Sequence, residues 1–220
     1  MIKKILLRIL LAIALVIVIL AGNLAIFNIL ASKVSEGIPI ADPPPPNSAL
    51  LVIDIQGGTT GEVSALNGLR EQSEQLIQEV NSLIEEAQAS DRLIVYVRTE
   101  VVNPLLNILN NTMARGSAGA ELDPRLSIQA GEVVVKKRKD PFIGTQLDQI
   151  LEEHQIGELV LVGLDAGECV EGAARAARNR GYAIKVVEEA VITNDVEDKA
   201  AALEDLRALG VDIISRDMGF

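Results

Sequence analysis

Three residues of this 220-residue chain could together make a nucleophile. Cys169, the one cysteine, follows a loop of small residues and opens a predicted helix. Asp54 ends the apolar run 49-ALLVID-54, and Lys136 ends 132-EVVVK-136. A helix N-terminus and a nearby lysine both favour the thiolate, so we expect a lowered pKa for Cys169. A carboxylate within reach could take the thiol proton and activate the sulfur.

Each of these residues also has a plainer reading. A single cysteine is commonly a buried core residue. Asp54 could end its strand by capping a turn, and Lys136 could begin the basic run 137-KRK-139. His154 has no second histidine to make it a metal ligand or a catalytic base, so we expect it at the surface. Residue type and spacing alone leave both readings open.

The elements that must position these side chains follow an alternating pattern. Short apolar runs are separated by helical stretches, which predicts β/α units and a mainly parallel, Rossmann-like sheet in a three-layer αβα sandwich. The ligand crevice of such folds lies beyond the carboxyl ends of the strands, where all three residues are expected. The predicted strands are 49–54, 93–97, 132–136, 158–163, 183–188 and 211–214, and the predicted helices are 64–89, 145–155, 169–180 and 197–209.

The N-terminus is apolar from Ile5 to Leu30. As a helix it would be about 39 Å long, enough to cross a bilayer with some tilt. We therefore predict one transmembrane helix within an N-terminal anchor of residues 1–32. The small residues of 30-LAS-32 leave a cleaved signal peptide as the alternative.

Basic residues flank this run unequally, with Lys3, Lys4 and Arg8 before or early in it and Lys33 closely after it. The bias predicts a cytoplasmic N-terminus and an extracytoplasmic domain. Residues 33–48 contain four consecutive prolines and predict a stiff, extended linker, with a proline-rich ligand as the alternative. Residues 49–220 then form the domain.

Composition excludes several classes of partner. The formal charge of −11 disfavours nucleic acid, whose binding needs clustered basic residues. One cysteine and one histidine cannot make an intramolecular disulfide or a zinc site of the usual ligand count. We expect neither a metal nor a cofactor.

Three motifs in order carry a family resemblance. The first is 50-LLVIDIQ-56, in which a strand ends in Asp and is followed by an apolar residue and Gln. In the second, Lys136 stands six residues before Phe142, which is followed by 144-GTQL-147; the third is 160-VLVGLDAGECV-170. The combination resembles the isochorismatase-like cysteine hydrolases, which include nicotinamidases, N-carbamoylsarcosine amidases and ureidoacrylate amidohydrolases.

This resemblance implies a catalytic triad on a six-stranded parallel sheet. Asp54 would act as base toward the thiol, Lys136 would support the thiolate, and Cys169 would attack a carbonyl to form a thioester that water hydrolyses. It also implies a cis peptide between Leu164 and Asp165, with the backbone amides of Asp165 and Cys169 as the oxyanion hole. Members of the family often form homo-oligomers, and this possibility stays open.

The substrate loops depart from the family pattern. Where relatives have an acidic residue or Asn and then an aromatic, this chain has 57-GGTTGE-62, so stacking on a flat ring is poorly supported. The stretch 96-YVRTEVVNP-104 lacks the histidine of metal-binding nicotinamidases, which disfavours that activity. Gln56, Arg98 and Phe142 are the candidate substrate-binding residues, with Arg98 pairing either with a substrate carboxylate or with a nearby acid.

We therefore expect a membrane-anchored cysteine hydrolase that cleaves a C–N bond of a small-molecule amide or ureido compound without a metal. One alternative is vinyl-ether hydrolysis of the isochorismatase kind, which leans on the aspartate and does not require the cysteine. The other is a catalytically silent binding or scaffold domain. Thiol reactivity would separate this last alternative from an enzyme.

Overall fold

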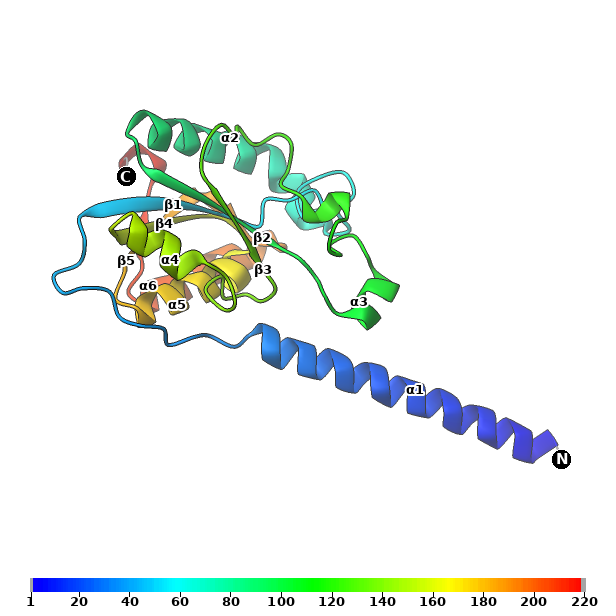
Figure 1. Ribbon diagram of the computed structural model, residues 1–220. Helices are drawn as coiled ribbons and strands as arrows, with labels where there is room; N and C mark the ends of the chain where they lie inside the picture. The colour runs from blue at the N-terminus through cyan, green and yellow to red at the C-terminus, as the bar shows by residue number, and fades with distance from the viewer. Residues whose placement is uncertain (1, 219–220) are drawn as a thin grey trace.

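The computed structural model describes residues 2–218, in which a sheet with helices on both faces is preceded by one long projecting helix (Figure 1). The sheet has six strands in the order β3-β2-β1-β4-β5-β6, and every neighbouring pair is parallel. The predicted α/β class and parallel six-stranded sheet are confirmed. The strands are β1 (Asn47–Ile53), β2 (Leu93–Thr99), β3 (Glu132–Lys136), β4 (Ile156–Leu164), β5 (Ala183–Ile192) and β6 (Asp212–Ile214).

The central strands are apolar on both faces because helices cover both. Residues 49–53 of β1 are completely buried, as expected of a parallel strand between two helical layers. One core lies between the sheet and α2 (Asn67–Ala89). The other lies between the sheet and α4 (Leu147–Glu153), α5 (Glu171–Asn179) and α6 (Lys199–Ala208). The three layers are visible in Figure 1, with α2 above the sheet.

Four α-helices lie within the predicted ranges, and one α-helix was not predicted. Helix α3 (Pro104–Leu109) follows β2, and it begins where the Asn103 side chain accepts hydrogen bonds from the amides of Leu105 and Leu106. It has six residues, too few for its apolar periodicity to stand out in the sequence. None of these six residues is buried.

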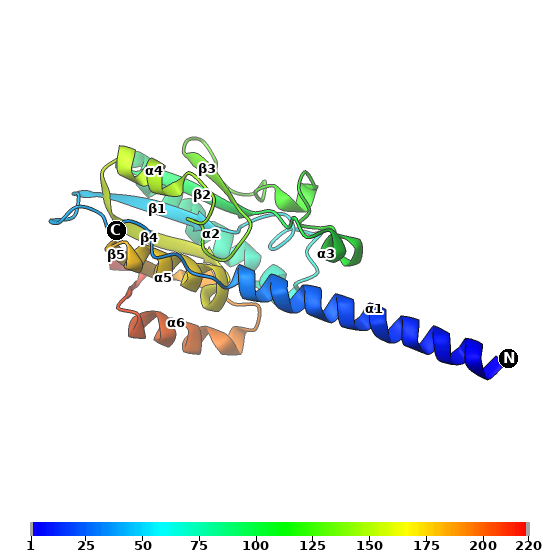
Figure 2. The ribbon, with the colours of Figure 1, turned by 60° about the horizontal axis from the view of Figure 1, so that its bottom comes forward.

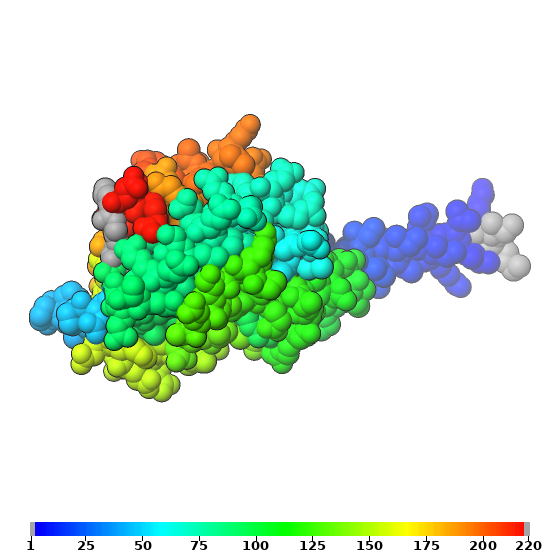
Figure 3. Space-filling model, turned by 90° about the horizontal axis from the view of Figure 1, so that it is seen from above, coloured from blue at the N-terminus to red at the C-terminus, as the bar shows by residue number. Residues whose placement is uncertain are grey.

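Most of helix α1 (Ile2–Ala31) projects away from the rest of the molecule, as Figure 3 also shows. The stretch Lys3–Ala31 is long and apolar enough to cross a membrane by length and composition. A signal sequence near the N-terminus would pass the same test. A membrane span is therefore a proposal, developed below.

The linker does not stand off as a free spacer. Ser35 donates from both its backbone amide and its hydroxyl to the Asp140 carboxylate, each at 2.7 Å. Arg180 donates to the Ser35 hydroxyl at 2.9 Å, and its carbonyl accepts from the amide of Ile40 at 2.8 Å. The first half of the linker is thus held on the domain, because its polar groups meet buried polar partners that local sequence does not reveal.

Candidate active site

Lys136 lies at the centre of a buried polar cluster at the carboxyl edge of the sheet. Its ammonium donates to Asp54 Oδ2 at 2.7 Å, to Thr99 Oγ1 at 2.7 Å and to Cys169 Sγ at 3.1 Å. These three bonds use the three donors of the ammonium, which is how a fully buried lysine stays charged. The structure therefore brings together the three residues singled out from the sequence.

Strand register explains why these side chains meet. In the parallel pair of β2 and β3, Thr99 lies opposite Lys136, and both end their strands. Asp54 follows β1 directly with φ of 55°, and its amide is held by the carbonyl of Val97 at 2.8 Å. The Thr59 hydroxyl donates to the Asp54 carbonyl at 2.6 Å. Both the backbone amide and the backbone carbonyl of Asp54 are thus hydrogen-bonded, which holds the residue that carries the carboxylate in place.

The Cys169 loop is held by contacts at both ends. Gly163, near the end of β4, has φ of 112°, and a Cβ there would lie 2.1 Å from the carbonyl oxygen of Ile53, so only glycine fits. The Leu164–Asp165 peptide is cis, at the position that the resemblance implied. The Asp165 carboxylate accepts from the amide of Gly167 at 3.0 Å and from that of Asn194 at 2.8 Å.

Cys169 itself lies in a π-helical turn, Ala166–Val170, which leads into α5. It is partly exposed, whereas Lys136 is fully buried. Of these two residues, Cys169 is thus the one nearer the surface of the domain.

The electrostatics of the cysteine differ from the sequence expectation. Burial, and then the negative charge of Asp54, raise the pKa of Cys169 to about 12, against the opposing effect of Lys136. The expected lowering of this pKa is therefore wrong, because the neighbouring carboxylate and the loss of water outweigh the lysine. The resting thiol keeps its proton, and the Asp54 carboxylate that could remove it shares the Lys136 ammonium with the sulfur.

Lys136 titrates in the opposite sense. Burial by itself lowers the pKa of an ammonium, but the charges of Asp54 and Cys169 act the other way, and the pKa of Lys136 is raised. The lysine is therefore a fixed positive charge beside the sulfur. It is placed to favour a thiolate once the thiol proton has left.

The three candidate substrate-binding residues serve other roles in the structure. Gln56 is fully buried, and its amide group donates to the carbonyls of Thr99 and Ala120 while its oxygen accepts from the Thr99 amide. Arg98 donates to Glu100 at 3.2 Å, so of its two predicted partners the structure has the nearby acid. Neither side chain is free for a substrate in this arrangement.

Phe142 is also a structural residue. It is 4% exposed and stacks on Tyr182 with ring centroids 6.3 Å apart. The guanidinium of Arg180 lies 4.1 Å from the centre of its ring. The aromatic face is covered on this side by protein groups, so its use as a substrate wall is not supported.

Sequence reasoning missed Thr99. Its hydroxyl accepts from Lys136 and donates to Asp54 Oδ1 at 2.9 Å, which links the cation and the carboxylate a second time. The available signal was position, because Thr99 ends an apolar strand just as Asp54 and Lys136 do. Its hydroxyl fixes the rotamer of the carboxylate that faces the thiol.

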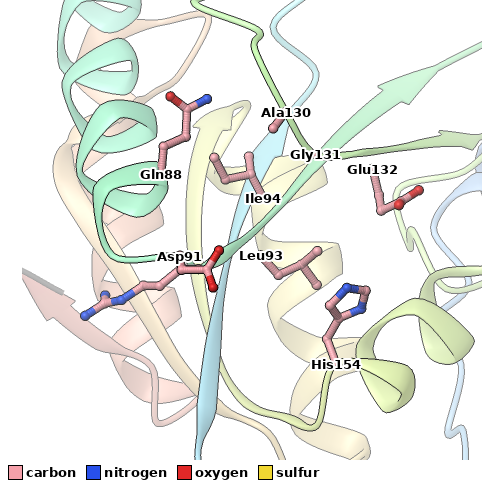
Figure 4. Close-up of a pocket in the computed structure, with 9 residues that line it drawn as sticks. Gln88, Asp91, Leu93, Ile94, Ala130, Gly131, Glu132 and His154 are labelled. Atoms are coloured by element: carbon pink, nitrogen blue, oxygen red, sulfur yellow. The ribbon is translucent and has the colours of Figure 1, made fainter.

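The opposite edge of the sheet carries different features. A cleft of about 430 Å³ lies there, between the end of α2 and the starts of β2 and β3, lined by residues that include Gln88, Leu93 and His154 (Figure 4). His154 is exposed, as expected, and its ring nitrogen Nδ1 lies 2.9 Å from the Ile150 carbonyl oxygen. Among residues 2–218, no group of three or more His, Cys, Asp or Glu is placed to hold a metal ion.

Comparison with known proteins identifies the family. The isochorismatase domain model matches residues 48–218, so the chain belongs to the isochorismatase family, as expected from its motifs. A secreted isochorismatase effector of Verticillium dahliae is 32% identical over 170 residues, which cover 76% of this chain and 83% of that protein.

Solved structures agree on the fold. N-carbamoylsarcosine amidase from Thermoplasma acidophilum has a TM-score of 0.66 at 28% identity, covering 78% of this chain and 98% of that one. An isochorismatase-like hydrolase from Alkaliphilus metalliredigens has a TM-score of 0.69 at 24% identity, covering 79% and 96%, a likeness of fold. The protein is thus an isochorismatase-family hydrolase.

Proposed function

We propose that this hydrolase cleaves a C–N bond of a small amide or ureido compound through a thioester on Cys169. The observation that carries the proposal is the contact of one buried ammonium, that of Lys136, with both the Asp54 carboxylate and the Cys169 sulfur. A purely structural lysine needs only a counter-charge, whereas this one also adjoins a thiol. An amidase among the structural neighbours supports the same reaction class.

The reaction is derived from these contacts in two halves. Asp54 takes the thiol proton as the sulfur attacks the carbonyl carbon, and Lys136 stabilises the charge on the sulfur. The protonated Asp54 then gives its proton to the departing nitrogen, and the C–N bond breaks to leave a thioester. Water, deprotonated by Asp54, attacks the thioester carbon, and the thiol leaves with that proton while the acid is released.

The carbonyl oxygen needs its own stabilisation during both attacks. We assign this to the backbone amides of Asp165 and Cys169, on the loop held by the Asp165 side chain. Preorganised donors of this kind contribute about 3 kcal/mol each at the transition state. No metal is required, since Lys136 and the amides supply the positive charge.

A screen of small amides and ureido compounds tests the proposal. Release of ammonia or amine would be measured for the wild-type protein and for Cys169→Ser, and intact mass would be recorded shortly after mixing. An acyl adduct on the wild type that is absent from Cys169→Ser supports the thioester. A hydrolase that turns over without an adduct and tolerates Cys169→Ser would contradict it.

That contrary outcome would favour vinyl-ether hydrolysis, for which the name of the Verticillium dahliae relative is the supporting observation. This chemistry relies on protonation by the aspartate, so Asp54→Asn would abolish it while Cys169→Ser would not. Complete inactivity over a broad screen, with no acyl adduct on Cys169, would instead favour a binding domain. The contact of Lys136 with the sulfur would then need a structural account.

We further propose that α1 anchors the protein in a membrane with its domain on the extracytoplasmic side. Support comes from the apolar length of Lys3–Ala31 and from the basic residues Lys3, Lys4 and Arg8 at its start. The secreted nature of one relative agrees with an extracytoplasmic domain. Carbonate-resistant membrane association with protease access to the domain in intact cells would test this, and release of the domain as a shorter chain would indicate cleavage instead.

A further inference from the structure

Helix α3 and its flanks form an apolar projection from the active-site edge. Val102 is 45% exposed, Ile108 78% and Leu109 73%, and no residue of α3 is buried. The segment follows β2 directly and so begins three residues after Thr99, which touches Lys136. Neighbouring exposed apolar side chains of this size indicate a contact surface.

This projection lies beside α1. The Asn103 amide donates to Asn23 Oδ1 at 2.9 Å, and Figures 1 and 2 both show α3 next to the long helix. On α1, Asn23 and Phe27 are partly covered on the side of the domain. Leu24, Ile26 and Ile29 stay 47%, 60% and 71% exposed. The apolar surface of α3 is therefore adjacent to that of α1.

The length of α1 places α3 at the membrane boundary. The segment from Ile5 to Gly22 is uninterrupted by Asn and, as 18 helical residues, is about 27 Å long, close to the thickness of a hydrocarbon core. Asn23 then lies where that core ends. Since Asn23 is the partner of Asn103, α3 lies at the same depth, within the interfacial layer.

Charge near this boundary has the sign that headgroups favour. The carbonyls of Leu30 and Ala31, at the end of α1, accept hydrogen bonds from the Arg138 side chain at 3.2 Å and from the Lys139 amide at 3.1 Å. Lys33 follows α1 closely and Lys137 directly precedes Arg138, and both lysines are exposed. Basic side chains here, in a protein of net charge −11, can contact the phosphates of headgroups on the side of the domain.

We propose that α3 and residues 23–31 of α1 form one membrane-contacting surface that lies in the interfacial layer of a phospholipid bilayer. This surface, with Val102, Ile108 and Leu109 as its apolar contacts, turns the carboxyl edge of the sheet toward the headgroups. The inference rests on the proposed anchor, since α1 must span for Asn23 to mark the boundary. It brings Cys169 to a membrane-borne amide without lifting that amide into bulk water.

Tryptophan fluorescence tests this placement, because the chain has no tryptophan and each variant carries a single reporter. Ile108→Trp reports on α3 and Leu15→Trp on the span. The matched control is Ile38→Trp, an 86% exposed isoleucine on the linker, beside Tyr182 and Ile156 on another part of the surface. Full-length protein would be reconstituted in vesicles of phosphatidylcholine and phosphatidylglycerol, with and without bromine on the acyl chains.

We expect bromine to quench both Leu15→Trp and Ile108→Trp by about twofold or more, as for side chains in contact with acyl chains, and to leave Ile38→Trp unchanged. Quenching of Leu15→Trp without Ile108→Trp would overturn the surface and leave the anchor standing. Absence of quenching at Leu15→Trp would overturn the anchor and this inference together. The Ile108→Trp side chain could instead be shielded from water, remain unquenched by bromine and be accompanied by cross-linked dimers. That result would mean that α3 contacts a second copy of the chain, and it would also overturn the membrane-contacting surface.

Discussion

Two buried cations in this molecule, Lys136 and Arg180, have nearly the same exposure, 0% and 3%, and different surroundings. The Lys136 ammonium donates to a carboxylate, a hydroxyl and a thiol at the carboxyl edge of the sheet. Arg180 ends on the Asp148 carboxylate, the Ser35 hydroxyl and the Ala176 carbonyl, against the ring of Phe142. The first cluster contains a thiol, and the second does not.

The comparison teaches that burial and charge do not by themselves mark a site. Both cations are paired, as any buried charge must be, and both join segments far apart in the sequence. The difference is that Lys136 shares its donors with a group that can form a covalent bond. Arg180 instead fastens the linker and α4 to the end of α5. We therefore expect changes at the two clusters to separate activity from stability.

The largest separation should be in activity. Cys169→Ser or Asp54→Asn is expected to lower the rate of amide hydrolysis by about a thousandfold or more, since each removes a group that reacts. Arg180→Met should leave the rate of the folded protein within about threefold, because its contacts end on structural groups. Rates would be measured on the best amide from the screen at a temperature where both variants are folded. Equal losses of hydrolysis rate at both clusters would contradict the distinction between a catalytic and a structural cluster.

Stability should separate the same clusters next. Lys136→Met leaves the Asp54 carboxylate, 5% exposed, without its cation and is expected to cost about 3 to 5 kcal/mol in free energy of unfolding. Arg180→Met should cost about 2 kcal/mol, because the Asp148 side chain is 53% exposed and regains water. Urea unfolding would measure both. The double change Lys136→Met with Asp54→Asn should recover part of the loss, and a cost that stays additive would contradict an unpaired charge as its cause.

The sequence predicted the sheet, and the meeting of polar strand ends at one of its edges, for a definite physical reason. Parallel strands buried on both faces are read as apolar runs, and their carboxyl ends meet at one edge, so Asp54 and Lys136 could be placed together without coordinates. The hydrogen-bond partners of Gln56 and Arg98 could not be predicted in the same way, because they depend on how the loops after β2 fold back. The pKa of Cys169 was mispredicted because burial of the sulfur and the Asp54 carboxylate is a tertiary property.

Thiol reactivity should show a smaller effect with an unusual sign. Burial and the Asp54 charge raise the pKa of Cys169 to about 12, so at pH 8 the wild-type thiol is mostly protonated and its alkylation should accelerate as pH rises. Asp54→Asn removes one cause of that shift and should speed labelling at pH 8 by about tenfold, even though it abolishes hydrolysis. Lys136→Met should slow labelling, because the cation that favours the thiolate is lost.

Iodoacetamide labelling followed by intact mass from pH 6 to 10 would measure this, with Cys169→Ser as the blank. A labelling rate that levels off below pH 8 in the wild type would contradict the raised pKa. Slower labelling in Asp54→Asn would mean that the carboxylate activates the resting thiol and does not merely await the substrate. Either result would change the order of proton transfer proposed for the first half of the reaction.

The smallest expected effect concerns the contacts that hold Ser35 of the linker on the domain. It tests whether these contacts contribute to stability alone. Ser35→Ala removes the hydroxyl between Asp140 and Arg180 but keeps the backbone amide that also donates to Asp140, so we expect a loss of about 1 kcal/mol. Urea unfolding would measure this loss of stability, with Ser32→Ala as a control at an exposed residue just before the linker. Asp140 lies four residues after Lys136. If the Ser35 contacts with Asp140 also influence the position of Lys136, Ser35→Ala would change the labelling rate of Cys169 as well. A stability loss with unchanged labelling would show that the two buried cations act independently, whereas a change in both would join them into one unit.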